Sequence, residues 1–264
     1  MMFRSKSPLF VAASLVAAFA GSAAMAQTKA PEPDYTLAYN VGAVTDYRFR
    51  GISQTNFNPA LQAGVDFSHK SGFYLGAFGS NVSWIKDFNG ATKGSYEIDL
   101  YGGYKGEIVK DFGYDVGLIT YQYPSNNSGA AGTPGAGLYS NASTNEFYGA
   151  LTYNIFTVKY SRSFGDFLGN LKSSGSQYLD LSANFDLGNG FTLTPHIGRQ
   201  TVPNQSPSAD YTDYSLTGAK DFGNGLSLSA AAIGTNAKNG GFYTDSKGRF
   251  LAKSTLVVGV KYSF

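Results

Sequence analysis

Charged residues at alternate positions are the first feature of this sequence that could do chemistry. Asp46, Arg48 and Arg50 are separated by Tyr47 and Phe49. In an extended strand this spacing places the three charges on one face and the two aromatic rings on the other. Charges that line a water-filled passage can select ions, whereas opposite charges on one wall can neutralise each other as ion pairs. The mixed signs favour ion pairing and leave the ion filter as the alternative.

Further charged residues lie near the ends of segments that alternate in the same way. Four carboxylates come at or near the start of such segments, and one arginine ends one. We expect them to face the same interior, near the same end of the molecule. The candidate lumen or constriction residues are therefore Asp46, Arg48, Arg50, Glu97, Asp99, Asp180, Arg199 and Asp213.

A hydrolytic site is a remote alternative. If segments 179–187 and 191–199 pair across the turn at 188–190, His196 falls opposite Ser182, with Asp180 close by. These residue types could serve as base, nucleophile and orienting carboxylate of an esterase. The group would face an interior that lipid acyl chains cannot easily enter. We therefore predict that the protein is not an enzyme.

The strand that ends the chain shows the clearest alternation. Every second residue back from the C-terminus is apolar, and the residues between are mostly small or polar. Such alternation sorts side chains onto two faces of a strand. A final strand that ends in Phe resembles the terminal strand of outer-membrane barrels, which their assembly machinery recognises. The predicted assembly signal is Leu256, Val258, Val260, Tyr262 and Phe264.

Twelve segments in all alternate in this way. They are 35–50, 61–68, 73–84, 96–101, 113–123, 146–153, 156–163, 179–187, 191–199, 211–220, 226–232 and 255–264. In 73–84 and 113–123 aromatic residues fall on both parities, so their faces stay undecided. A charge on a lipid-facing surface at the bilayer midplane costs about 2 to 4 kcal/mol, which turns the charged face of the other segments inward.

The connections between these segments alternate in length. Compact turns lie near 70–72, 106–112, Asn154, 188–190 and 221–225, and mostly longer loops near 51–59, 85–94, 124–145, 164–176, 200–210 and 235–249. Backbone groups in hydrocarbon must all be paired, so a sheet can cross a bilayer only when it closes. The pattern predicts an all-β, antiparallel, up-and-down transmembrane barrel of about 12 strands, with both termini on the periplasmic side. A soluble sandwich or lipocalin-like barrel is the alternative.

The N-terminus carries the pattern of an export signal. Arg4 and Lys6 precede an apolar run, and Ala24-Met25-Ala26 offers a cleavage site. The run is shorter than the roughly 20 residues of a membrane-spanning helix. We expect residues 1–26 to be removed, leaving a single barrel domain, 27–264.

Composition narrows the possible partners. Without Arg4 and Lys6 the 20 basic residues become 18, equal to the 18 acidic ones, so nucleic acid is not expected as a partner. Aromatic residues make up 15% and charged residues 14%, which suits a sheet that meets lipid. The chain has no cysteine and two histidines, so no metal, cofactor or disulfide is expected.

Several motifs resemble those of a known family. Residues 46–54, Asp-Tyr-Arg-Phe-Arg-Gly-Ile-Ser-Gln, resemble the opening motif of the TorF-family porins of proteobacteria. Supporting motifs are Ser71-Gly72-Phe73-Tyr74, Gly79-Ser80-Asn81-Val82, Glu97-Ile98-Asp99, Tyr121-Gln122-Tyr123-Pro124, His196-Ile197-Gly198-Arg199 and Asp210-Tyr211-Thr212-Asp213-Tyr214. The resemblance implies an outer-membrane barrel and names no solute or site. The Gly/Ser/Asn-rich insertion 125–144 departs from it.

The sequence thus predicts a channel in the outer membrane of a Gram-negative bacterium. Small hydrophilic solutes or ions would pass through it passively, and its other partners would be outer-membrane lipid and the barrel-assembly machinery. A narrow or closed barrel with a surface-binding or envelope-structural role is the alternative. The loop 124–145 either stays at the surface or folds inward to narrow the pore.

Overall fold

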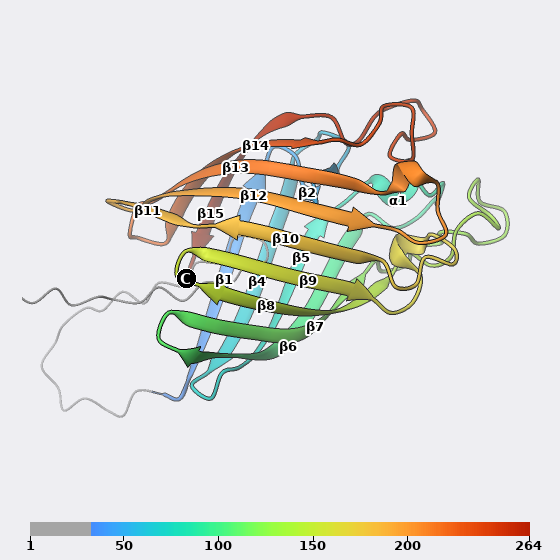
Figure 1. Ribbon diagram of the computed structural model, residues 1–264. Helices are drawn as coiled ribbons and strands as arrows, with labels where there is room; N and C mark the ends of the chain where they lie inside the picture. The colour runs from blue at the N-terminus through green and yellow to red at the C-terminus, as the bar shows by residue number, and fades with distance from the viewer. Residues whose placement is uncertain (1–32) are drawn as a thin grey trace, which may run out of the picture.

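The computed structural model describes residues 33–264, so the predicted export signal lies outside the described residues. The chain forms one closed antiparallel barrel (Figure 1). Its strands are β1 (Tyr35–Val44), β4 (Ala60–His69), β5 (Phe73–Asn81), β6 (Tyr96–Val109), β7 (Phe112–Gln122), β8 (Thr144–Tyr153), β9 (Phe156–Ser163), β10 (Gln177–Ala183), β11 (Phe185–Gly188), β12 (Phe191–Thr201), β13 (Tyr211–Asp221), β14 (Leu226–Thr235) and β15 (Thr255–Ser263).

Each strand pairs with the next along the chain, and β1 pairs with β15 to close the barrel. β10 and β11 both pair with β12 and are interrupted only by Asn184, so they fill one strand position. The thirteen strands of the sheet therefore occupy twelve strand positions around the barrel. This confirms the predicted twelve-stranded, up-and-down barrel.

The two faces of the sheet differ as the alternation predicts. Outward positions carry exposed apolar side chains, among them Leu37, Val41 and Leu100. The register settles the two undecided segments, because Leu75 pairs with Gly102 and Leu118 with Phe147 on the outward face. The predicted assembly residues also point outward, from Val260 at 41% exposed to Phe264 at 66%. The opposite parity faces the lumen.

Short connections gather at one end of the barrel and long loops at the other (Figure 1). The turn between β8 and β9 consists of Asn154 and Ile155, and Asn154 has φ +53°. Asparagine tolerates this left-handed conformation better than most residues, which suits a two-residue hairpin turn. Lys70 N donates to Asp34 O, and Tyr39 and Phe264 exchange backbone hydrogen bonds. Both ends of the described chain therefore lie at the short-turn end.

The first strand ends earlier than predicted. β1 stops at Val44, whose register partner is Ala60 at the start of β4. The expected strand 35–50 was wrong beyond that point, because residues 45–59 leave the wall. They form a small hairpin, β2 (Arg48–Phe49) paired with β3 (Ile52–Ser53), which we call the inner hairpin.

The remaining loops cover the inner hairpin at the mouth. They include α1 (Trp84–Asp87) and two 3-10 turns, η1 (Phe167–Gly169) and η2 (Pro207–Ala209). Three apolar clusters join hairpin and loops, and their buried members include Trp84, Ile52 and Phe167. None of the helices between residues 33 and 264 has the length and apolar character needed to cross a bilayer.

Candidate functional site

The inner hairpin owes its shape to a tight turn at its tip. Arg50 and Gly51 join β2 to β3 with φ +48° and +80°. Positive φ at both central residues is the geometry of a type I′ turn, which favours glycine. A Cβ on Gly51 would also lie 2.8 Å from Asp213 Cβ and 2.8 Å from Thr235 Cγ2. The tip thus rests directly against β13 and β14.

Asp46 holds the base of the inner hairpin. Its carboxylate lies 2.6 Å from Arg48 Nε and accepts hydrogen bonds from Ser53 Oγ at 2.6 Å and Thr55 Oγ1 at 3.2 Å. Arg48 also donates to the carbonyl oxygens of Gly51, Leu251 and Lys253. Burial lowers the pKa of Arg48, and Asp46 partly offsets this. These two charges therefore neutralise each other within the hairpin, in the manner of the ion pairing that their mixed signs favour.

Arg50 attaches the tip of the hairpin to the opposite wall. It donates to Glu146 Oε2 on β8 at 2.6 Å and to Gln200 Oε1 on β12 at 2.8 Å. Its guanidinium lies 4.3 Å from the ring centroid of Tyr178 on β10, and its carbonyl accepts from Tyr211 Oη on β13 at 2.8 Å. Burial alone would lower the pKa of Arg50, but Glu146 more than offsets it, so that pKa lies above its ordinary value.

The other side of the hairpin contacts β5, β6 and β7. Tyr47 Oη donates to Glu97 Oε1 at 2.5 Å, and its ring meets Phe78 edge-on at 6.0 Å. Phe49 meets Tyr121 in the same manner at 5.3 Å. Burial, followed by the nearby Glu97, raises the pKa of Tyr47, which keeps the phenol protonated as the donor. With Arg50 on the far wall, the inner hairpin spans the mouth of the barrel.

Three buried carboxylates line the wall beside the hairpin. Glu97 and Asp99 on β6 are 2% and 6% exposed, and Glu146 on β8 is fully buried. Asp99 lies between Phe78 and Tyr121 in register, on the lumen face. Asp99 Oδ1 and Glu146 Oε1 have no hydrogen-bond partner within residues 33–264. Arg50 contacts this group through Glu146.

A second polar group surrounds His196 on the lumen face. Its Nε2 lies 2.7 Å from Asp180 Oδ2 and 3.1 Å from Tyr178 Oη, and its Nδ1 lies 3.7 Å from Asp213 Oδ1. Ser182 is the register partner of His196, as predicted. Both ring nitrogens nevertheless face carboxylates, and no hydrogen bond between Ser182 and His196 occurs in the described chain. The ring therefore points at carboxylates and not at the Ser182 hydroxyl, which a general base would have to activate.

Comparison with known proteins places this chain in a family. The family model described as "Bacterial protein of unknown function (Gcw_chp)" matches residues 28–264. The chain belongs to the Gcw_chp family. A search of curated proteins found no match for this Gcw_chp protein.

Solved structures resemble the Gcw_chp barrel in fold. The NanC porin is 12% identical, with 87% of this chain and 99% of that chain covered and a TM-score of 0.54. The KdgM porin in complex with disordered oligogalacturonate is 8% identical, with 86% and 98% covered and a TM-score of 0.53. At these identities the likeness shows a shared porin-type barrel.

The Gcw_chp barrel brings together most of the predicted lumen residues. Glu97, Asp99, Asp180 and Asp213 face the lumen from strands, and the first three charges lie in the inner hairpin. Arg199 does not join them. It shares the outward face with Ile197, is 48% exposed, and lies 3.9 Å from Asp210. That part of the prediction was wrong, because Arg199 was placed by its height along the barrel and not by its parity.

Sequence reasoning missed Glu146, Gln200 and Tyr178, which anchor Arg50. Glu146 could have been found, because Phe147 and Leu151 are apolar at the opposite parity in the same segment. Gln200 lies just beyond the predicted end of its strand, and Tyr178 just before the predicted start of its own. Only the fold of the hairpin shows that these three residues meet one arginine.

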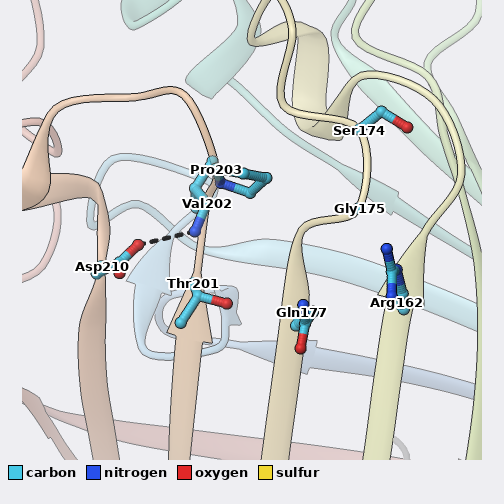
Figure 2. Close-up of a pocket in the computed structure, with 8 residues that line it drawn as sticks. All are labelled: Arg162, Ser174, Gly175, Gln177, Thr201, Val202, Pro203 and Asp210. Atoms are coloured by element: carbon cyan, nitrogen blue, oxygen red, sulfur yellow. Dashed lines mark hydrogen bonds between the residues drawn. The ribbon is translucent and has the colours of Figure 1, made fainter.

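A separate groove of about 260 Å³ opens at the rim (Figure 2). Arg162, Gln177 and Thr201 line it from outward positions that pair with one another in register. Asp210 closes one side by accepting a hydrogen bond from Val202 N at 2.8 Å (Figure 2). Its strand residues face outward, so this groove belongs to the outer surface of the barrel and not to the lumen.

The long insertion remains among the outer loops. Asn127 side-chain groups contact Thr92 and Lys93, and Ser140 donates to Asp166 at 2.9 Å. The cavity of about 50 Å³ beneath the loops is lined by other segments, including Phe49 of the inner hairpin. Of the two predicted arrangements, the surface loop is the one these contacts support, and residues 45–59 are the segment that enters the mouth.

Proposed function

We propose that this protein is an outer-membrane channel of the porin type, through which small hydrophilic solutes or ions diffuse passively. The observation that carries the proposal is the closed twelve-stranded barrel, whose outward face is apolar and whose lumen face is polar and charged. A polar lumen suits water and the solutes that water carries. We also propose that residues 1–26 direct export and are then removed, and that both termini of the barrel lie on the periplasmic side. A relationship to the TorF-family porins is part of the same proposal.

In this proposal the inner hairpin is the constriction. It reaches from β6, through the Tyr47–Glu97 hydrogen bond, to β8, β12 and β13 through Arg50. A solute entering from the loop end has to pass between the hairpin and the wall. Small solutes fit this arrangement better than polymers, because the hairpin contacts both sides of the mouth.

A second function, a closed barrel with a surface-binding or structural role, is favoured by one observation. The loops share buried apolar cores with the hairpin, and those cores include Trp84, Tyr211 and Leu251. Such packing stabilises a cover over the mouth. The two functions differ in whether solute crosses the purified protein.

Liposome swelling with a graded series of sugars decides between them. A variant lacking residues 47–56 removes the hairpin, and Val44 and Ala60 remain adjacent in register, so a short turn can still join them. We expect the wild type to admit only the smallest solutes and the shortened variant to admit larger ones. If neither protein admits any solute, the channel is excluded and the closed barrel is the better account.

A further inference from the structure

The charges of the lumen are strongly unequal. By register, the lumen face of the described strands carries ten carboxylates, namely Asp66, Glu97, Asp99, Glu107, Asp115, Glu146, Asp180, Asp186, Asp213 and Asp221. The same face carries three lysines, Lys105, Lys159 and Lys261, together with His196. The whole chain is nearly neutral, so the excess of negative charge belongs to the lumen in particular.

The basic residues that could balance this excess lie elsewhere or are already paired. Arg199 and Lys220 occupy outward positions on β12 and β13. Arg48 is neutralised by Asp46 inside the hairpin. Arg50 is the hairpin cation that contacts the wall, where it pairs with Glu146.

The imbalance is sharpest at the constriction. Glu97, Asp99 and Glu146 stand beside the hairpin, where Arg50 pairs with Glu146. Asp99 is 6% exposed, its Oδ1 has no hydrogen-bond partner in the described chain, and its lumen-face neighbours in register are Phe78 and Tyr121. A buried carboxylate oxygen without a donor is costly unless a cation or proton approaches it.

These carboxylates do not form a fixed metal centre. Among the described residues no set of three or more acidic or histidine side chains is close enough to hold a metal ion. Spread along a confined wall, they instead lower the energy of any mobile cation and raise that of an anion. The neighbours of Asp99 in register, Phe78 and Tyr121, are aromatic residues, a type that also attracts organic cations.

We infer that the channel selects small cations, inorganic ions and protonated or quaternary amines alike, over anions, with Asp99 and its neighbours as the selectivity determinant. The inference rests on the proposed channel function. It distinguishes this lumen from one suited to an acidic sugar chain such as the oligogalacturonate named with the KdgM porin.

The test is the reversal potential of the purified full-length barrel in planar bilayers under a KCl gradient, at about pH 8 and again at about pH 10, because carboxyl groups hold fewer protons at the higher pH. We expect a permeability ratio of potassium to chloride several-fold above one. Asp99→Asn should move the ratio toward one, and Lys105→Gln should raise it. Replacing potassium by choline on one side should preserve cation current, because the proposed channel admits organic cations as well.

Arg199→Gln is the matched control, because it changes a charge near the same end of the barrel on the outward face. It should leave the ratio unchanged. Conductance that favours chloride, shows no preference, or is unaffected by Asp99→Asn overturns the inference and leaves the channel intact. A protein that inserts but never conducts overturns both.

Discussion

Arg50 Nη2 lies 2.6 Å from Glu146 Oε2, and the two side chains are 7% and 1% exposed. One residue belongs to the inner hairpin and the other to the wall of the barrel. The two residues are 96 positions apart in the sequence, so the pair forms only when the hairpin meets the wall at β8. The pair therefore reports directly on whether the constriction is in place.

Replacing Arg50 by Met should release the hairpin from the wall. Removing one partner of a buried ion pair costs about 3 to 5 kcal/mol, because the other charge stays buried and unpaired. We expect larger and noisier single-channel currents in planar bilayers. Adding Glu146→Gln to Arg50→Met should recover part of the wild-type behaviour, since no lone carboxylate remains. Equal currents in the wild type and in Arg50→Met would show that the hairpin does not limit flow.

Gly51→Ala should disturb the hairpin through contact as well as through backbone strain. Its φ of +80° costs an L-residue about 1 to 2 kcal/mol, and its added Cβ would meet Asp213 and Thr235 at 2.8 Å. Gly132 has nearly the same φ, +81°, with nothing within 4 Å of the added atom. Urea unfolding in lipid vesicles should show a greater decrease in the free energy of unfolding for Gly51→Ala than for Gly132→Ala. Equal losses would mean that the tip does not press on the wall.

Ser182→Ala should have no effect on hydrolysis of a short-chain nitrophenyl ester. His196 Nε2 lies 2.7 Å from Asp180 and Nδ1 lies 3.7 Å from Asp213, so the ring is placed to hold its protons. We expect purified wild-type protein and the variant to give the same background rate. A rate that falls in Ser182→Ala would contradict this arrangement and restore the esterase alternative.

The strands of the barrel wall were predictable, because the alternation of apolar and polar residues shows which face of a strand meets an apolar environment. The inner hairpin was not, because Asp46 to Arg50 alternate as regularly as the strand before them. What ends β1 is a tertiary relationship, the pairing of Val44 with Ala60. Arg199 is a different case, because its parity with Ile197 could be read from the sequence and the prediction used only its height along the barrel. The local pattern of residue types determines which face of a strand points outward. Contacts between distant segments determine where a strand leaves the barrel wall.

The loop 236–254 should stay ordered until the solution becomes strongly acidic. Burial alone would raise the pKa of Asp245, but hydrogen bonds from the backbone and side chain of Arg249 lower it below its ordinary value. A lowered pKa stabilises the loop above the unfolded value, near 3.9, and this stabilisation is lost as pH falls through the folded value. Asp245→Asn should expose Lys247 and Arg249 to trypsin at neutral pH. If trypsin cleaves the wild type as fast as the variant, the hydrogen bonds between Asp245 and Arg249 do not hold the loop.

A substitution at Phe264 can separate two roles of the last strand, closure of the barrel and recognition by the assembly machinery. Its backbone exchanges hydrogen bonds with Tyr39 at 3.0 Å in each direction, while its ring is 66% exposed and stacks on Tyr39 at 5.8 Å. Phe264→Ala keeps the backbone bonds that help close β15 onto β1 and removes the ring. If the assembly machinery reads the ring, the variant should reach the outer membrane of cells at a reduced level. It should still refold into detergent and show the heat-dependent gel shift of a barrel.

Phe222→Ala is the matched control for this experiment, because Phe222 is also an exposed aromatic residue at the short-turn end, beyond β13. It should assemble in cells like the wild type. If Phe264→Ala fails to refold in detergent as well, the ring acts in closing the barrel and recognition by the assembly machinery is not needed to explain its effect. If both variants assemble normally, the terminal ring carries neither role, and the backbone pairing of β15 with β1 is sufficient for assembly.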